Sequence, residues 1–156
     1  MPVYCVDSSS LIEAADIYPI GNPLFAPFWS WFDGLIGAGT IIAPDEVRVE
    51  LEKRAQSPLW EWMKSRRETL FQEHTTDVQT VFREIMKSHP QLTKKNKPEA
   101  KSDGDAWVIA MAKVRAAVCV AEDKRRRGGT SFPEVCGAYG VSIVRLGDLI
   151  VRETGT

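Results

Sequence analysis

Four acidic residues, far apart in the sequence, each stand where a strand is expected to end or a helix to begin. Asp7 and Asp123 each follow a short apolar run. Asp105 opens a helical pattern, and Glu50 lies two helical turns beyond a third apolar run. In an open α/β sheet, ligands bind outside the carboxyl ends of parallel strands, so these carboxylates are expected to converge on one crevice.

Carboxylates that share a crevice repel one another and need a cation to remain ionised. Their hard oxygen atoms suit Mg²⁺ or Mn²⁺, whose usual biological partner is a phosphate group. Such an ion binds phosphate oxygens and activates a water molecule for in-line attack, so no covalent enzyme intermediate is required. The pattern favours a metal-dependent phosphodiesterase with Asp7, Glu50, Asp105 and Asp123 as ligands.

Two neighbours of these residues are reserve ligands. Glu122 is adjacent to Asp123, and adjacent side chains cannot both point into the crevice, so either of them could be the fourth ligand. Asp103 lies two places before Asp105 and could reach the same ion. Every one of these acids also has a structural alternative, as a helix cap or a solvated surface charge.

Ser9 stands two residues beyond Asp7, in a run of three serines. Its hydroxyl could hydrogen-bond a metal-bound water or a phosphate group. It could equally cap the helix that follows, because serine is a preferred N-cap residue. Both interpretations remain open at the level of sequence.

Basic residues cluster directly after the fourth acidic position. Lys124, Arg125, Arg126 and Arg127 precede two glycines, so they could form a cationic loop that grips a phosphate backbone at the mouth of the site. The alternative is an ordinary solvated loop. The four lysines between residues 94 and 101 carry the same two interpretations.

Length and composition define the general class. A chain of 156 residues with 44% hydrophobic residues fits one domain, residues 1–156. Its formal net charge of -1 means that nucleic-acid binding must depend on local patches. No run approaches the ~20 apolar residues of a membrane span, and the start does not resemble a signal peptide, so we expect a cytoplasmic protein.

Strand-like and helix-like patterns alternate along the chain. Apolar runs predict strands at 3–6, 40–42, 69–71, 117–120 and 141–144. Helical spacing predicts helices at 11–15, 25–36, 44–54, 59–64, 78–86, 105–113, 132–139 and 147–152. We interpret four tryptophans, at 29, 31, 60 and 62, as core or interface rather than a base-stacking platform. His74 and His89 are expected at the surface or in caps. The alternation indicates an α/β domain with a largely parallel sheet.

Four segments resemble the acidic motifs of PIN-domain nucleases, in the same order. They are Val6-Asp7-Ser8-Ser9-Ser10-Leu11-Ile12, then Pro44 with Val47 and Glu50-Leu51, then Asp105-Ala106-Trp107-Val108-Ile109-Ala110-Met111-Ala112, and Val118-Cys119-Val120-Ala121-Glu122-Asp123. Family members usually have Thr at the place of Ala121. The tail at 132–141 also resembles a little-characterised PIN-like branch.

The resemblance implies a single PIN-like domain, three-layer α/β/α with a central mostly parallel sheet. It also implies a Mg²⁺- or Mn²⁺-dependent endoribonuclease. Many small bacterial members, the VapC-like toxins, belong to type II toxin–antitoxin pairs, with an antitoxin partner and often a homodimer. The alternative is a catalytically inactive PIN fold that binds RNA or protein. A phosphatase of another α/β family is disfavoured, because Asp7 does not begin an Asp-x-Asp pattern.

Overall fold

The computed structural model describes residues 2–54, 57–92, 104–122 and 132–155. Within them, five strands form one sheet in the order β3-β2-β1-β4-β5, and all neighbouring strands are parallel. The strands are β1 (Tyr4–Val6), β2 (Ile41–Pro44), β3 (Phe71–Gln72), β4 (Val118–Val120) and β5 (Ile143–Val144). The predicted α/β class with a parallel central sheet is confirmed.

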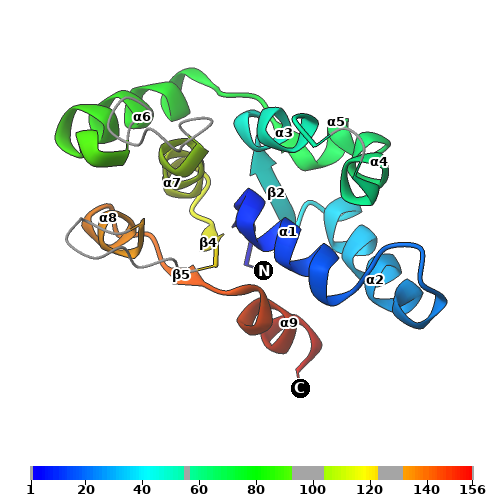
Figure 1. The fold of residues 1–156 in the computed structure, drawn as a ribbon. Helices are drawn as coiled ribbons and strands as arrows, with labels where there is room; N and C mark the ends of the chain where they lie inside the picture. The colour runs from blue at the N-terminus through cyan, green and yellow to red at the C-terminus, as the bar shows by residue number, and fades with distance from the viewer. Residues whose placement is uncertain (1, 55–56, 93–103, 123–131, 156) are drawn as a thin grey trace.

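Helices cover both faces of the sheet, which gives three layers (Figure 1). They are α1 (Ser8–Ile17), η1 (Pro23–Phe25), α2 (Ala26–Gly37), α3 (Asp45–Glu52), α4 (Pro58–Lys64), α5 (Arg67–Leu70), α6 (Thr76–Ser88), η2 (Pro90–Leu92), α7 (Gly104–Val114), α8 (Phe132–Ala138) and α9 (Leu146–Thr154). On one face α7 packs on β1, β2 and β4, with α6 and α8 against it. On the other face α1 contacts α3, α4 and α9. No helix among the described residues is long and apolar enough to cross a lipid bilayer.

The register of the central strands places the candidate site at the carboxyl edge of the sheet. Val6, the last residue of β1, is paired with Val120, the last residue of β4. The amide N–H of Asp7 donates to the carbonyl oxygen of Val120 at 2.8 Å. The chain therefore leaves both strands at the same level, and the residues that follow them meet at this edge.

The third strand is shorter and later than predicted. The sequence predicts a strand at 69–71, but Leu70 ends α5 and only Phe71 and Gln72 pair with β2. The amides of Thr69 and Leu70 donate to the carbonyl oxygen of Arg66, which closes a helical turn. This turn buries Leu70 completely, so tertiary packing overrides the strand preference of a β-branched and apolar run.

The three cysteines are free thiols inside the core, with no exposed surface. Burial raises the pKa of the Cys5 and Cys119 thiols, because the thiolate would lose its hydration there. They therefore stay protonated and pack as small apolar side chains, as their positions in apolar runs indicate.

Candidate functional site

Asp7 lies at the end of the central strand and caps the helix that follows. Its carboxylate Oδ2 accepts a hydrogen bond from the amide of Ser9 at 3.2 Å, which is the N-cap contact of α1. Only 7% of its surface is exposed. A charged side chain in such a place requires either neutralisation or a nearby cation.

Two other predicted ligands lie near enough to Asp7 to act on its charge. Burial is the main cause that raises the pKa of Asp7, to about 7, and the charge of Asp105 is the next. The charge of Glu50 raises it further, whereas the hydroxyl of Ser9 lowers it by hydrogen bonding to the carboxylate. The structure therefore brings an acid that follows β1 near acids from α3 and α7 that are far away in the sequence.

The first turn of α1 gives one hydroxyl to each of three carboxylates. Ser8 Oγ donates to Glu50 Oε2 at 2.5 Å, and Ser9 Oγ donates to Asp7 Oδ2 at 2.6 Å. Ser10 Oγ donates to Glu122 Oε2 at 2.9 Å. The sequence predicts a role at the site only for Ser9, and the roles of Ser8 and Ser10 emerge from the structure; the run of three serines before an apolar helix is the one sequence signal for them.

The structure gives Ser9 a contact that differs from both interpretations offered by its sequence. Its hydroxyl donates to Asp7 and accepts from the amide of Glu122 at 3.1 Å. The side-chain cap of α1 comes from Asp7, not from Ser9. Ser9 therefore orients the Asp7 carboxylate, and its contact with a water or a phosphate stays a prediction.

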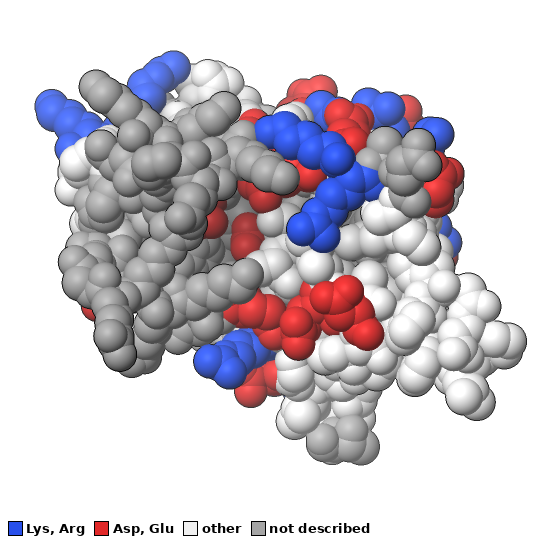
Figure 2. Space-filling view, in the orientation of Figure 1, with Lys and Arg blue, Asp and Glu red and all other residues white. Residues whose placement is uncertain are grey.

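Several predicted residues lie outside the described part of the chain. They are Asp103, Asp123, Lys124, Arg125, Arg126, Arg127 and the lysines between 94 and 101. The fourth ligand therefore stays a prediction, with Asp123 and its reserve Glu122. Figure 2 shows acidic and basic side chains both gathered in the middle of one face, so the visible charge there is mixed rather than uniformly basic.

The donor set suits a hard divalent ion. Among the described residues, no group of three or more His, Cys, Asp or Glu side chains is arranged to surround one ion. Mg²⁺ does not require such a cage, because it keeps several waters and is usually bound by one or two carboxylates and the substrate phosphate. A buried Asp7 beside Asp105 and Glu50 is an environment that a cation would stabilise. The residues present therefore fit Mg²⁺ or Mn²⁺.

Aromatic stacking holds the helix that carries Asp105. The ring of His74 stacks on Trp107 with centroids 3.8 Å apart, and Phe82 stacks on Trp107 at 3.6 Å. His74 is half-buried just before the N-cap of α6, so of its two predicted positions, surface or cap, the open surface is excluded. Burial lowers its pKa, and Nε2 has no hydrogen-bond partner among the described residues. These ring contacts hold α6 against α7 at Trp107, which lies two residues after Asp105.

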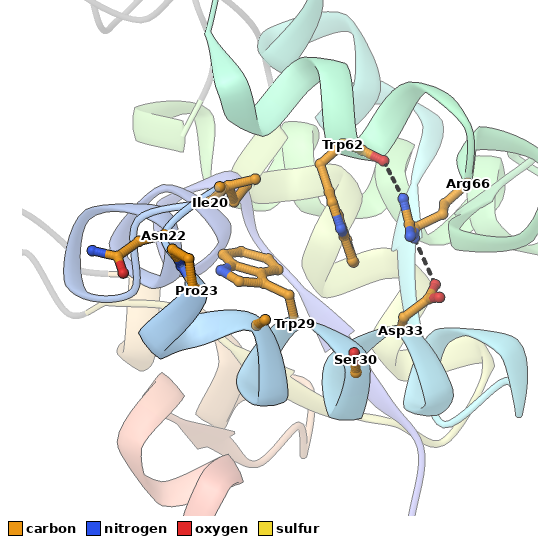
Figure 3. Close-up of a pocket in the computed structure, with 10 residues that line it drawn as sticks. Ile20, Asn22, Pro23, Trp29, Ser30, Asp33, Trp62 and Arg66 are labelled. Carbon is orange, nitrogen blue, oxygen red and sulfur yellow. Dashed lines mark hydrogen bonds and ion pairs between the residues drawn. The ribbon is translucent and has the colours of Figure 1, made fainter.

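Away from these carboxylates, a cavity of about 300 Å³ lies between α2 and α4 (Figure 3). Trp29 and Trp62 form its apolar wall, and the Trp29 indole N–H donates to the carbonyl oxygen of Tyr18 at 2.7 Å. The Arg66 guanidinium lies 3.7 Å from the centre of the Trp62 ring and pairs with Asp33 at 2.6 Å. Trp29 and Trp60 are buried, as the core interpretation predicts.

The architecture and the carboxylate edge define this protein as an α/β domain with a PIN-like three-layer fold. The crystal structure of VapBC2 from Rickettsia felis bound to a DNA fragment from their promoter is similar, with a TM-score of 0.54 and 13% identity. That similarity covers 92% of this chain and 98% of the other. The crystal structure of FitAcB from Neisseria gonorrhoeae has a TM-score of 0.47 and 15% identity, over 93% of this chain and 99% of the other.

At 13% identity the similarity to VapBC2 concerns the fold alone. A family model described as "Domain of unknown function (DUF4411)" matches residues 4–156. The chain belongs to this family. Comparison with curated proteins gives no match.

Proposed function

We propose that this protein is an endoribonuclease that depends on Mg²⁺ or Mn²⁺ and hydrolyses phosphodiester bonds. The observation that carries the proposal is the buried Asp7 carboxylate, whose pKa is raised by burial and by the charges of Asp105 and Glu50. A bound divalent ion would supply charge neutralisation at the phosphate and activation of the attacking water.

At this edge we assign one role to the acidic residues and another to the serines. Asp7, Asp105 and Glu50 supply oxygen ligands from three separate elements, and Asp123 is the proposed fourth. Ser8 and Ser9 hold two of these carboxylates in place through short hydrogen bonds. These hydrogen bonds restrain the Asp7 and Glu50 carboxylates, so less reorganisation of these two side chains is needed when the phosphate binds.

The proposal includes a biological setting. We propose that the protein is the toxin of a type II toxin–antitoxin pair, acts in the cytoplasm, binds an antitoxin and forms a homodimer. The support is the similarity of fold to VapBC2, whose structure contains promoter DNA. Co-purification with the product of an adjacent gene, and loss of RNA cleavage in that complex, would test this setting.

The nuclease proposal predicts metal-dependent cleavage of RNA by the purified chain. We expect cleavage of single-stranded RNA in millimolar Mn²⁺ or Mg²⁺, and none after chelation by EDTA. Asp105→Asn should lower the rate by about 10³-fold, equivalent to about 4 kcal/mol of transition-state stabilisation. The measurement is the single-turnover rate on a labelled RNA, with a DNA of the same sequence alongside.

The second candidate function is that of a catalytically inactive PIN fold that binds RNA or protein. Two observations favour it: Ala121 stands where related motifs usually have Thr, and no three-residue metal cluster exists among the described residues. RNA that binds but stays intact in every divalent ion tested would establish this alternative in place of the nuclease.

The three arginines at 125–127 are proposed to contact RNA phosphates. Changing all three to Ala should weaken RNA binding and reduce the slope of log Kd against log salt by about 2 units, because fewer counterions are released. The control changes three exposed basic residues elsewhere, Arg83, Lys87 and Lys113, to Ala. Equal slopes for the two triple variants would return 125–127 to the ordinary solvated surface.

A further inference from the structure

The carboxylate of Glu122 joins two helices at the point where β4 ends. Its Oε2 accepts from Ser10 Oγ at 2.9 Å and from the backbone amide of Leu146 at 3.2 Å. Ser10 is completely buried on α1, and Leu146 is the first residue of α9. The negative charge therefore lies at the N-terminus of α9, where the helix dipole favours an anion.

The backbone of the same residue reaches the candidate metal site through Ser9. The amide N–H of Glu122 donates to Ser9 Oγ at 3.1 Å, and Ser9 Oγ donates to Asp7 Oδ2 at 2.6 Å. A hydroxyl has only one proton, so accepting from Glu122 leaves that proton for Asp7. Glu122 thus connects α9 to the Asp7 carboxylate: its side chain accepts from Leu146, and its backbone amide donates to Ser9, which donates to Asp7.

We propose that Glu122 is a positioning residue of the candidate nuclease site and not a metal ligand. By holding its carboxylate on Ser10 and Leu146, the protein fixes its backbone amide where it orients the Ser9 hydroxyl, and Ser9 in turn orients Asp7. The inference rests on the proposed function. It also removes the ambiguity of the sequence, in which Glu122 was the reserve for Asp123.

The alternative, in which Glu122 turns to bind the ion, conflicts with its surroundings. Release of the carboxylate would leave the buried Ser10 hydroxyl without the acceptor that it has here, which is unfavourable. It would also add a further negative charge to a place where charges already raise the pKa of Asp7. The present contacts avoid both penalties.

Two substitutions at Glu122 separate positioning from ligation. Glu122→Gln keeps an oxygen acceptor for Ser10 and Leu146 but loses the charge, whereas Glu122→Ala loses both. We expect the Gln variant of the full chain to bind Mn²⁺ within about twofold of the parent. The Ala variant should bind about 10-fold more weakly, the usual effect of losing an outer support of a metal ligand.

Asp148→Ala is the matched control, because Asp148 caps the same end of α9 by accepting from the amide of Arg145 at 3.0 Å rather than from Ser10 or Leu146, the partners of Glu122. It should weaken α9 and leave Mn²⁺ affinity unchanged. Ser9→Ala removes the link while keeping Glu122 on its two partners. It should match Glu122→Ala, and the double variant should be no weaker than either single one.

A metal-free measurement keeps this inference separate from the proposed function. In the protein without divalent ions, the ¹³C chemical shift of the Asp7 carboxyl carbon should change in Glu122→Ala and in Ser9→Ala, but not in Asp148→Ala. A parent chain that binds no Mn²⁺ overturns the proposed function. An Asp7 signal unmoved by Glu122→Ala overturns the positioning role, and a Gln variant that loses Mn²⁺ as completely as Asp7→Asn makes Glu122 a ligand.

Discussion

Replacing Asp7 by Asn is expected to abolish divalent-dependent RNA cleavage and to stabilise the metal-free fold. Asn removes a buried charge but still accepts from Ser9 and is an equally good N-cap for α1. The pKa of Asp7 is raised from 3.8 to about 7, so the ionised form destabilises the fold by as much as about 4 kcal/mol. Chemical denaturation and the single-turnover cleavage rate measure the two effects.

The stabilisation should depend on pH in a defined direction. At pH 8 the carboxyl group is ionised in the folded and unfolded states, and the folded state bears the full penalty. As the pH falls from about 7 towards 4, the folded state takes up a proton first, so the penalty and the advantage of Asn both decrease. Asp16→Asn, an exposed change on the same helix, should show neither effect. A destabilised Asp7→Asn variant at pH 8 would contradict the buried-charge interpretation.

The sheet and one edge of the site were predictable because parallel strands constrain both sequence and position. Strands buried on both faces appear as continuous apolar runs, and their carboxyl ends lie at one edge. An acid that directly follows such a run, as Asp7 does, is therefore expected at this edge. The same rule predicted the approach of Asp105, which opens a helix on the opposite face of the sheet.

The hydrogen bonds within the site were not predictable, because they depend on helix geometry and distant partners. Consecutive residues on a helix point about 100° apart, so three serines in a row reach three different carboxylates. Sequence spacing alone does not indicate that Ser8 would reach Glu50, 42 residues away, or that Ser10 would reach Glu122, 112 residues away. The stack of His74 on Trp107 is another long-range contact, made when α6 packs on α7.

Binding of Mn²⁺ to the folded chain is expected to raise its melting temperature. An ion that binds only the folded state stabilises it by about 1.4 kcal/mol at ten times its dissociation constant, or about 3–6 °C for a domain of this size. The parent should show this shift in millimolar Mn²⁺ at pH 8. A variant with Asp7 and Asp105 both changed to Ala should not, because it loses two of the proposed oxygen ligands.

The charge change in that double variant needs its own control. Asp16 and Glu84 are exposed acids on α1 and α6, and changing both to Ala alters the net charge by the same amount. This control should keep the full Mn²⁺-induced rise in melting temperature. Both double variants change the net charge equally, so any general attraction of Mn²⁺ to surface charge is nearly the same in the two. If the parent, the control and the site variant all shift equally, the ion binds elsewhere. If that result comes with intact RNA, the protein uses its PIN-like fold as an interaction module and not as a nuclease.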